Sequence, residues 1–402
     1  MTPFFYRGRI PGSKSVLNRL LILKSFEPGV EINGDSRADD VVKMKAALAQ
    51  LHRGELADCG AAGTTLRFLA LRASRIPGTH HLSGSLRLFA RPQGELERIL
   101  GQLGCQTQFG PQRMTIRGSG WQIPDQGVRI ERSISSQFAS ALILSAWGLP
   151  KPLKIQLEGS AVSLGYLQMT LDTAREAGMN WSREPDGSIL IPANSTILQK
   201  RYEVESDLSS AFAVAGLAAV GGRAEFEAWP EKSSQPDSVF TDILAKMGCG
   251  VRREGSTLIV ESPTSGKLKG VDWNLKDSPD LFPVLSVLCA LAEGRSRLSG
   301  APHLVHKESN RVLKSAELVQ LLGRKAQDFA GGGLEIHGIA SSASANQTVG
   351  TFEYDPEHDH RLAMAAAVAR AAGFSIRILR PDVVNKSFPE FWSIAGASGA
   401  TK

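Results

Sequence analysis

Cysteine is scarce in this chain of 402 residues, and the few cysteines form no pattern. The sequence has 4 cysteines and no CxxC pair. These counts argue against a disulfide framework or a zinc knuckle, and we expect reduced thiols that lie mostly in a core. The four residues are Cys59, Cys105, Cys249 and Cys289.

Long apolar runs are also missing. The longest nearly uninterrupted run, Leu281 to Ala292, falls well short of the ~20 residues that a membrane-spanning helix needs. The opening residues MTPFFYRGRIPG contain no apolar region followed by a small-residue cleavage site. We therefore expect neither membrane insertion nor secretion, and a cytoplasmic location.

Two nucleotide-binding motifs are absent as well. No GxGxxG follows a predicted strand and no GxxxxGK[ST] occurs, which argues against a Rossmann sheet and excludes a P-loop. Charge of one sign is only slightly in excess, because 46 basic residues stand against 40 acidic ones, a net charge of +6. This surplus does not indicate nucleic-acid binding, but it suits small anionic ligands.

The composition is otherwise that of a globular protein with a large core. Apolar residues make up 42% of the chain and charged residues 21%, both of which are ordinary values. At ~100 to 200 residues per domain, the length allows two or three domains.

A repeat punctuates the chain. Four predicted helices end in an apolar residue followed by glycine, at Gly104, Gly178, Gly248 and Gly323. After each glycine come two short alternating runs separated by a turn, as in CGVRREGSTLIVES. This order predicts a helix, its glycine C-cap and a β-hairpin.

A second family of predicted helices is more apolar and begins with small polar or charged residues, near positions 14, 64, 136, 209, 280 and 360. Six comparable units of strands and helices predict an α/β or α+β chain that groups as two domains of three units. If these helix starts share a space, their free N–H groups would bind an anion. The alternative is that the Ser, Thr and Asp residues are only ordinary N-caps.

Eleven short motifs then follow one another in the order of one enzyme family. On these motifs the chain resembles the enolpyruvyl transferase family, and within it the members that act on shikimate 3-phosphate. The similarity runs from Arg9 to about Trp392. The motifs are PGSKSVLNR (11–19), ADD (38–40), GAAGTTLRFL (60–69), ARPQGEL (90–96), SSQF (135–138), VSLGY (162–166), ESDLSSA (205–211), DSPDLFP (277–283), HKESNR (306–311), DHR (359–361) and NKSFPEF (385–391).

The resemblance implies a two-domain α/β (α+β) fold in which each domain is an inverse α/β barrel of three βαβαββ-type units. The acceptor domain would span residues 11–205 and the other 206–402 plus 1–10. A hinge near 10–11 and 205–206 would let the domains close over the substrates. The implied reaction transfers the enolpyruvyl group of phosphoenolpyruvate to the 5-hydroxyl of shikimate 3-phosphate and releases phosphate, on the pathway to chorismate and aromatic amino acids. It needs no metal or cofactor, and we expect a monomer that binds neither nucleic acid nor membrane.

The same resemblance assigns residues to phosphoenolpyruvate. Its phosphate and carboxylate call for cations, and arginine's planar fork suits a carboxylate better than a point charge does. Glycine at position 63 would let the backbone approach the ligand. The implied set is Lys14, Arg91, Lys386 and Gln137 for the phosphate, Arg311 and Arg361 for the carboxylate, and Gly63 and Thr64 beside them.

Shikimate 3-phosphate and the proton transfers take a second set by resemblance. Asp280 would deprotonate the 5-hydroxyl, and Glu308 would exchange a proton with the methylene carbon, with Lys14 as the second candidate. The residues implied to bind the acceptor are Ser135, Ser136, Ser163 and Gln137 for its phosphate, Ser15 and Arg19 for its carboxylate, Tyr166 for one wall, and Lys307 and Asp280 for its hydroxyls.

The motifs depart from the family's pattern mainly on the acceptor side, which puts the contacts to the acceptor's hydroxyls in question. The retained Gly63 indicates sensitivity to glyphosate, although Phe68 replaces a proline that is common there. The other departures are Ala61 for asparagine, His303 and Val305 for asparagine and arginine, Asn310 for aspartate, and Leu164-Gly165 for a lysine-proline pair.

Three alternatives to this interpretation differ in the chemistry they require. The HxxH and HxH spacings around His303 and His358 occur at metal sites, but no HExxH accompanies them. Family members that act on UDP-N-acetylglucosamine carry a mobile cysteine before the arginine-proline step, and residues 84–90 contain none. A polyanion-binding scaffold without activity would not need Lys14, Asp280, Glu308 and Lys386 together.

Overall fold

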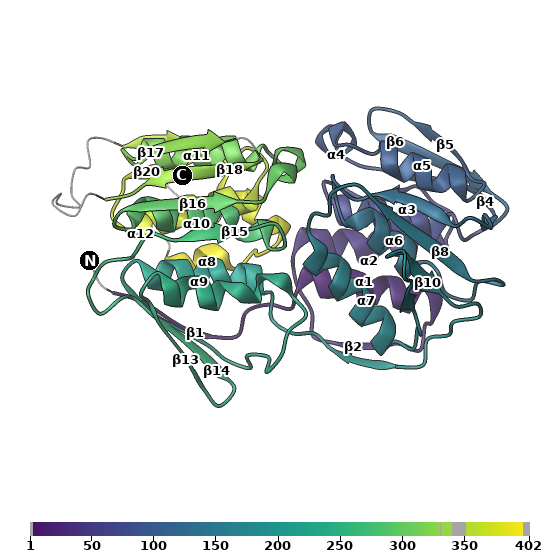
Figure 1. The fold of residues 1–402 in the computed structure, drawn as a ribbon, viewed down its shortest axis with the longest axis horizontal. Helices are drawn as coiled ribbons and strands as arrows, with labels where there is room; N and C mark the ends of the chain where they lie inside the picture. The colour runs from purple at the N-terminus through teal and green to yellow at the C-terminus, as the bar shows by residue number, and fades with distance from the viewer. Residues whose placement is uncertain (1–2, 330, 340–350, 397–402) are drawn as a thin grey trace. The chain divides into compact units, whose positions relative to one another are not determined.

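A computed structural model describes residues 3–329, 331–339 and 351–396 of the protein (Figure 1). The chain divides into two compact units. The continuous unit is Gly12–Val204, and the discontinuous unit joins the chain up to Pro11 with the chain from Glu205 onward. Each unit mixes helices and strands, which confirms the predicted α/β class.

The continuous unit opens with a helix that Ser13 caps, because its hydroxyl accepts a hydrogen bond from the backbone N–H of Val16. Its elements are α1 (Lys14–Phe26), β2 (Glu31–Asn33), α2 (Asp39–His52), β3 (Ala57–Asp58), α3 (Gly63–Ala73), β4 (Gly78–Ser83), α4 (Leu86–Ala90), α5 (Gly94–Gln102), β5 (Gln106–Phe109), β6 (Arg113–Gly118), β7 (Val128–Glu131), α6 (Gln137–Leu144), β8 (Leu153–Glu158), α7 (Leu164–Glu176), β9 (Ser182–Arg183), β10 (Ile189–Ile191) and β11 (Arg201–Glu203).

The discontinuous unit begins with a strand from the start of the chain, β1 (Phe4–Gly8). Its other elements are α8 (Leu208–Ala219), β12 (Gly222–Phe226), η1 (Pro236–Val239), α9 (Phe240–Lys246), β13 (Gly250–Glu254), β14 (Thr257–Glu261), β15 (Asp272–Asn274), η2 (Pro279–Leu281), α10 (Phe282–Leu291), β16 (Arg295–Ser299), η3 (Pro302–His306), α11 (Arg311–Leu321), β17 (Lys325–Phe329), β18 (Gly333–His337), β19 (Phe352–Tyr354), α12 (His360–Ala371), β20 (Ile376–Ile378), η4 (Pro381–Lys386) and α13 (Phe391–Ala395).

One sheet pattern recurs four times in the part of the chain that the structure describes. A parallel pair is followed by an antiparallel hairpin, giving the orders β3-β4-β6-β5, β7-β8-β10-β9, β1-β12-β14-β13 and β15-β16-β18-β17. The four predicted hairpins are thus confirmed, and the glycine before each has a positive φ, a conformation that disfavours other residues. The third repeat of each unit is shorter than expected, since among the described residues it has only a parallel pair, β11-β2 or β19-β20.

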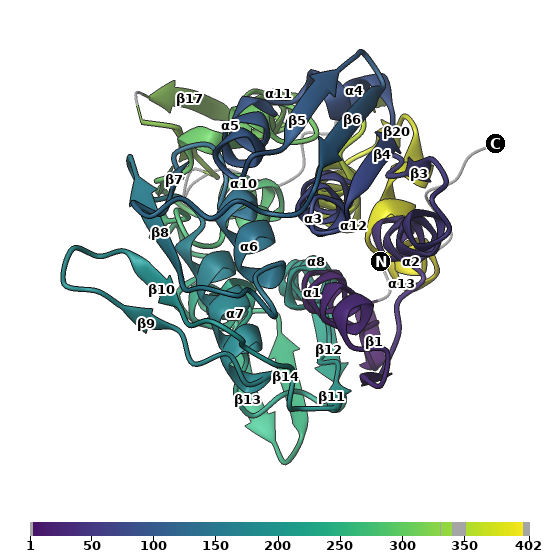
Figure 2. The same cartoon turned by 90° about the vertical axis from the view of Figure 1, so that its right-hand side faces the viewer.

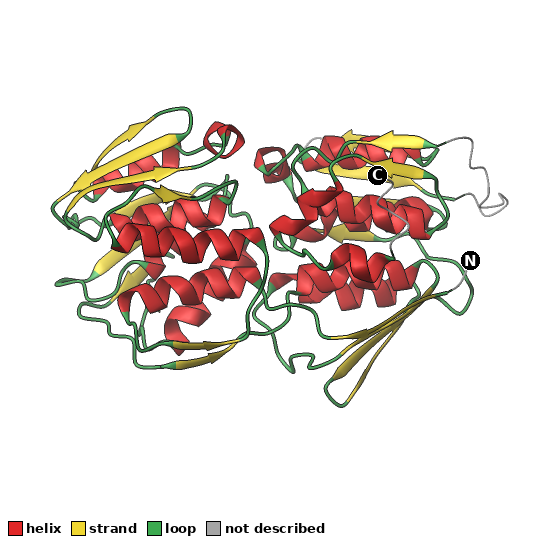
Figure 3. Cartoon of the chain, turned by 180° about the vertical axis from the view of Figure 1, so that it is seen from behind, coloured by secondary structure: helices red, strands yellow, loops and turns green. Residues whose placement is uncertain are grey.

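The apolar helices form the inside of each unit. All six begin where the sequence predicts, with α1, α3 and α6 in one unit and α8, α10 and α12 in the other. Within each set of three, every helix contacts the other two. In Figure 3 the helices of each unit lie together with strands at its periphery, and Figure 2 shows α1, α3, α6 and α7 side by side.

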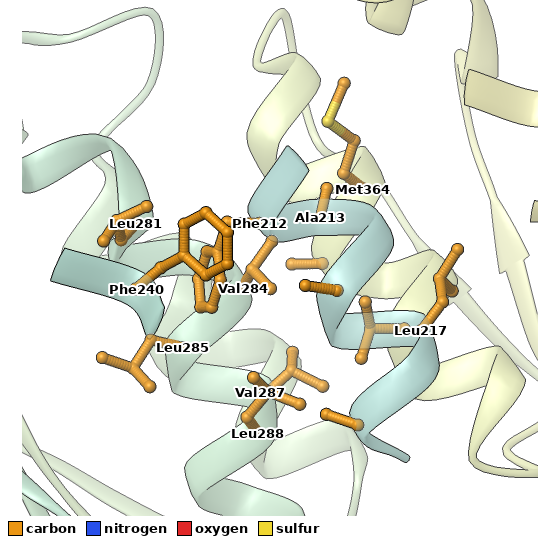
Figure 4. Packing of buried hydrophobic residues seen from close by; sticks show 14 of the residues in the cluster. Phe212, Ala213, Leu217, Phe240, Leu281, Val284, Leu285, Val287, Leu288 and Met364 are labelled. Atoms are coloured by element: carbon orange, nitrogen blue, oxygen red, sulfur yellow. The ribbon is translucent and has the colours of Figure 1, made fainter. Parts of the chain in front are cut away.

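Burial explains why these helices lack a polar face. Every residue of α8 is buried, and its Phe212 packs against Phe240 of α9 within the same hydrophobic cluster as Val284 of α10 and Met364 of α12 (Figure 4). Truncating a core side chain of this size to alanine costs about 3–5 kcal/mol. The interior of these helices therefore serves mainly for packing, and most residues available for chemistry lie at or near the helix starts.

Candidate functional site

In the discontinuous unit, acidic and basic side chains meet at the starts and ends of short elements. Asp280 lies in η2, Glu308 precedes α11, Arg311 begins α11, Arg361 lies in the first turn of α12 and Lys386 ends η4. We call these five residues and Asp359 the charge-paired cluster. Sequence positions far apart are thus brought together here.

Asp280 bridges two arginines. Its Oδ1 accepts a hydrogen bond from Nη1 of Arg311 at 2.7 Å, and its Oδ2 accepts one from Nη2 of Arg361 at 2.6 Å. Both arginine side chains are almost fully buried. Such charge-assisted contacts are about twice as strong as neutral ones, so this carboxylate holds the two guanidiniums in a fixed arrangement.

Glu308 connects the same arginine to a lysine. Its Oε2 lies 3.3 Å from Nη2 of Arg311, and its Oε1 lies 3.3 Å from Nζ of Lys386. A carboxyl group next to an ammonium group can exchange a proton without a metal. The proposed acid/base residue therefore has a cationic neighbour on each oxygen.

Asp359 completes the cluster, and our sequence reasoning did not assign it. It accepts hydrogen bonds from Nε and Nη2 of Arg311 at 2.7 and 3.2 Å, from the hydroxyl of Ser309 at 3.2 Å and from the backbone N–H of Arg361 at 3.0 Å. Burial would lower the pKa of Arg311, but Asp359, Asp280 and Glu308 raise it well above its ordinary value. Asp359 therefore holds the Arg311 guanidinium in its orientation through Nε and Nη2.

His303 and Lys307 adjoin this cluster. His303 is buried in η3, and burial together with the charge of Lys307 lowers its pKa from 6.5 to about 3, against the opposing effect of Asp280. The imidazole is therefore neutral at physiological pH. A neutral imidazole can donate and accept a hydrogen bond as an asparagine amide does, which makes this departure chemically conservative.

A second departure also has a local explanation. Asn310 is the N-cap of α11, and its side-chain oxygen accepts a hydrogen bond from the backbone N–H of Leu313 at 3.2 Å. Asparagine and aspartate are about equally good N-caps. Asn310 therefore does the capping that the family's aspartate would do.

In the continuous unit, the predicted residues gather at helix starts. Hydrogen bonds tie these starts to one another: Gln137 Nε2 donates to the hydroxyl of Thr64 at 3.0 Å, which joins α6 to α3. Helix starts present unpaired N–H groups and a positive dipole end. The helix-start cluster is Lys14, Ser15, Arg19, Gly63, Thr64, Arg67, Arg91, Ser135, Ser136, Gln137, Ser163 and Tyr166.

Arg67 is the residue of this cluster that our sequence reasoning missed. Its Nη1 donates to Oε1 of Gln137 at 2.7 Å and to the hydroxyl of Ser135 at 3.4 Å, while Nε donates to Oε1 of Gln93 at 3.3 Å. Its guanidinium also lies over the ring of Phe138, 4.5 Å from the centroid. An arginine inside the apolar run GTTLRFLAL was the available signal, because a fully buried arginine needs partners.

Gly63 makes room for Arg91. A Cβ at position 63 would lie 2.6 Å from Nη1 of Arg91 and 3.1 Å from its Cζ. Arg91 is itself buried. Its guanidinium can lie against the start of α3 because residue 63 has no side chain. Near the same helix starts, Nζ of Lys14 pairs with Asp40 at 3.0 Å.

Arg19 joins α1 to α7. It donates to the hydroxyl of Thr170 at 2.8 Å and to the backbone oxygens of Ser15 at 2.7 Å and Tyr166 at 2.9 Å. Burial lowers its pKa to about 10. Ser163, the N-cap of α7, has a left-handed backbone with φ 53°, a strained conformation that costs of order 1–3 kcal/mol for a non-glycine residue.

Two structural absences hold for the described residues. They contain no group of three or more His, Cys, Asp or Glu side chains that could hold a metal ion. None of their helices has both the length and the apolar character needed to cross a membrane.

Comparison with known proteins covers nearly the whole chain. The model of the family described as EPSP synthase (3-phosphoshikimate 1-carboxyvinyltransferase) matches residues 9–394. Two curated relatives named 3-phosphoshikimate 1-carboxyvinyltransferase are each 32% identical: that of Methanopyrus kandleri, with 96% of this chain and 88% of the relative covered, and that of Syntrophobacter fumaroxidans, with 95% and 94% covered.

Solved structures share the fold at lower sequence identity. The EPSP synthase of Acinetobacter baumannii superposes with a TM-score of 0.74 at 22% identity, covering 99% of this chain and 96% of that one. The enolpyruvyl transferase NikO of Streptomyces tendae gives a TM-score of 0.71 at 13% identity, covering 98% and 94%.

Proposed function

The chain belongs to the EPSP synthase family, and from this premise we propose how its residues transfer the enolpyruvyl group of phosphoenolpyruvate to the 5-hydroxyl of shikimate 3-phosphate. The protein is an enzyme of the shikimate pathway. The proposal concerns the division of labour: the helix-start cluster binds phosphate-bearing substrate groups, and the charge-paired cluster binds a carboxylate and moves protons.

The observation that carries this proposal is that Arg311 and Arg361 both donate hydrogen bonds to one carboxylate, that of Asp280. The two guanidiniums hold Asp280 through separate oxygens at 2.7 and 2.6 Å. This is the geometry that a substrate carboxylate needs, since each of its oxygens would accept from one arginine. We assign the carboxylate of phosphoenolpyruvate to this pair.

The phosphate groups have donors of other kinds. For phosphoenolpyruvate we propose Lys14, Arg91 and Lys386, with Gln137, Gly63 and Thr64 beside them. For shikimate 3-phosphate we propose Ser135, Ser136, Ser163 and Gln137 at its phosphate, Ser15 and Arg19 at its carboxylate, Tyr166 as a wall, and Lys307 and Asp280 at its hydroxyls. The Arg67 network supports the assignment of Gln137 and Ser135, because both side chains are held in place by one guanidinium.

The chemical step is an addition followed by an elimination, with proton transfers in each. Glu308 gives a proton to the methylene carbon, while Asp280 takes the proton of the 5-hydroxyl, whose oxygen bonds to C2. Glu308 then takes a proton back from the new methyl group, the bond between C2 and the phosphate oxygen breaks, and inorganic phosphate leaves with the electron pair of that bond. Preorganised charges from Arg311, Arg361 and Lys386 stabilise the charge that develops.

We also propose that the enzyme works as a cytoplasmic monomer. All the assigned residues come from one chain, so a second copy is not needed to complete either set. The four cysteines are buried free thiols, which fits a reducing compartment. Size-exclusion chromatography with light scattering tests the monomer.

Phosphate release tests the reaction itself. The protein is mixed with phosphoenolpyruvate and either shikimate 3-phosphate or UDP-N-acetylglucosamine, and inorganic phosphate is measured over time. We expect release with shikimate 3-phosphate and none with the nucleotide sugar. Release with the nucleotide sugar alone would show the wrong acceptor, and release with neither would indicate a binding protein.

A further inference from the structure

The charge-paired cluster raises a question that the reaction does not answer. Asp280, which we assign as the base, occupies the arginine pair that we assign to the substrate's carboxylate. One carboxylate at a time can take the two short contacts at 2.7 and 2.6 Å. The substrate and Asp280 must therefore compete for Arg311 and Arg361.

Asp359 and Asp280 differ in how firmly they are held. Asp359 is fully buried and has hydrogen bonds from the Arg311 guanidinium, the Ser309 hydroxyl and the Arg361 backbone. Asp280 lies in the three-residue element η2, and its side chain keeps 17% of its surface exposed. Of Asp280 and Asp359, Asp280 is the one that solvent and a ligand can reach.

Charge balance points the same way. The cluster contains three carboxylates, Asp280, Glu308 and Asp359, and three cations, Arg311, Arg361 and Lys386. With the adjoining Lys307 counted, a further anion would meet a surplus of one positive charge, whereas an anion that replaces Asp280 at the arginines meets two cations in a buried setting. Displacement is therefore the favourable route, because buried charge requires a partner.

We propose that Asp280 is a resident counter-ion of the Arg311–Arg361 pair, that the carboxylate of phosphoenolpyruvate displaces it, and that this displacement frees Asp280 to accept the acceptor's 5-hydroxyl proton. The inference rests on the proposed function and adds a coupling between donor binding and base activation. A carboxylate held by two guanidiniums is a poor proton acceptor, since protonation would forfeit both ion pairs. Asp280 would thus become an effective base only when the donor has arrived.

The test is equilibrium binding of phosphoenolpyruvate without acceptor, so that no turnover occurs. Isothermal titration calorimetry compares the unmodified protein with Asp280→Asn and Asp280→Ala, and inorganic phosphate serves as a second probe without a carboxylate. We expect both variants to bind phosphoenolpyruvate about tenfold more tightly, the effect of relieving one charge-assisted competitor, with phosphate binding unchanged. Asp277→Asn, which removes an exposed carboxylate three residues away, should alter neither affinity.

The outcomes separate cleanly. Unchanged or weaker phosphoenolpyruvate binding in both variants overturns the inference, and so does an equal gain for phosphate, which would be a general charge effect. Melting curves establish that each variant is folded, and the asparagine variant preserves the side chain's size if alanine destabilises η2. Failure of the unmodified protein to release phosphate with shikimate 3-phosphate would instead count against the proposed function.

Discussion

The two clusters hold Arg311 and Arg19, their central buried arginines, by opposite means. In the charge-paired cluster, Arg311 contacts three carboxylates and Lys386 contacts one. In the helix-start cluster, Arg19 is held by two carbonyl oxygens and a hydroxyl. Neutral oxygens position a guanidinium without cancelling its charge, so that cluster suits phosphate binding, whereas carboxylates beside cations can exchange protons.

This difference assigns turnover mainly to one unit and substrate affinity mainly to the other. A substitution among the carboxylates should therefore lower kcat, and one among the neutral oxygens or their arginines should raise KM. Substitutions in each cluster test that division.

Glu308→Gln tests the role of the charge-paired cluster in turnover and should have the largest effect. The amide keeps the side chain's shape near Arg311 and Lys386 but cannot exchange the proton, so kcat should fall by about a thousandfold while either KM changes little. Steady-state phosphate release measures both constants. Glu317→Gln is the control, because Glu317 lies on α11 and pairs with Lys314 instead. Equal effects on kcat and KM would mean that Glu308 only positions its neighbours.

Arg67→Met tests the binding half. Removing the guanidinium leaves the oxygens of Gln137, Gln93 and Ser135 without their common donor, and hydrogen bonds to charged groups are worth about 1.5–3 kcal/mol. We expect KM to rise about 10- to 100-fold, with a much smaller change in kcat.

The control for Arg67 lies on the same helix. Arg72 donates to the hydroxyl and backbone oxygen of Ser25, away from the helix-start cluster. Arg72→Met should lower the melting temperature and leave KM unchanged. If both variants raise KM alike, the effect of Arg67 is on stability rather than on the site.

Much of this architecture could be predicted because its signals are local. The helix starts and the four hairpins follow from the apolar periodicity and from glycines with positive φ. The two shortened repeats were also visible in principle, since four glycine-hairpin signals accompany six helix starts. The six helix starts alone predict a hairpin in the third repeat of each unit, where the described residues form only a parallel pair of strands.

The contacts within the site could not be predicted, because they join residues distant in sequence. Arg67 and Gln137 are 70 residues apart, Arg311 and Asp359 are 48 apart, and Asp280 and Arg361 are 81 apart. Resemblance named most of the chemical groups, yet it could not tell that Asp280 occupies the arginine pair or that Asp359 holds Arg311. Only the fold brings those side chains together.

Gly63→Ala should sharpen the comparison within the helix-start cluster. The new Cβ would collide with Arg91, so KM for phosphoenolpyruvate should rise about fivefold, a loss of about 1 kcal/mol, while KM for shikimate 3-phosphate stays constant. Stability should hold or improve, because alanine favours a helix over glycine. Gly94→Ala, at a helix start with nothing within 4 Å of the new Cβ, should change stability alone. If the KM for phosphoenolpyruvate rises in Gly94→Ala as well as in Gly63→Ala, the collision with Arg91 does not explain the effect.

His303, the neutral imidazole beside the charge-paired cluster, should make stability rather than turnover depend on pH. Its pKa is 6.5 ordinarily and about 3 in the folded protein, so between these values the unfolded chain binds a proton that the folded one does not. The free energy of unfolding should then fall as the pH falls through this window, by up to about 1.4 kcal/mol per pH unit.

Between pH 6 and 5 this contribution is separable, because ordinary carboxylates titrate at lower pH. Urea unfolding at several pH values should show a shallower slope for His303→Asn than for the unmodified protein. If His303→Asn keeps the full slope, the imidazole is not held neutral, and the charge-paired cluster tolerates an additional cation. The contrast between the two clusters would then lie in geometry rather than in charge balance.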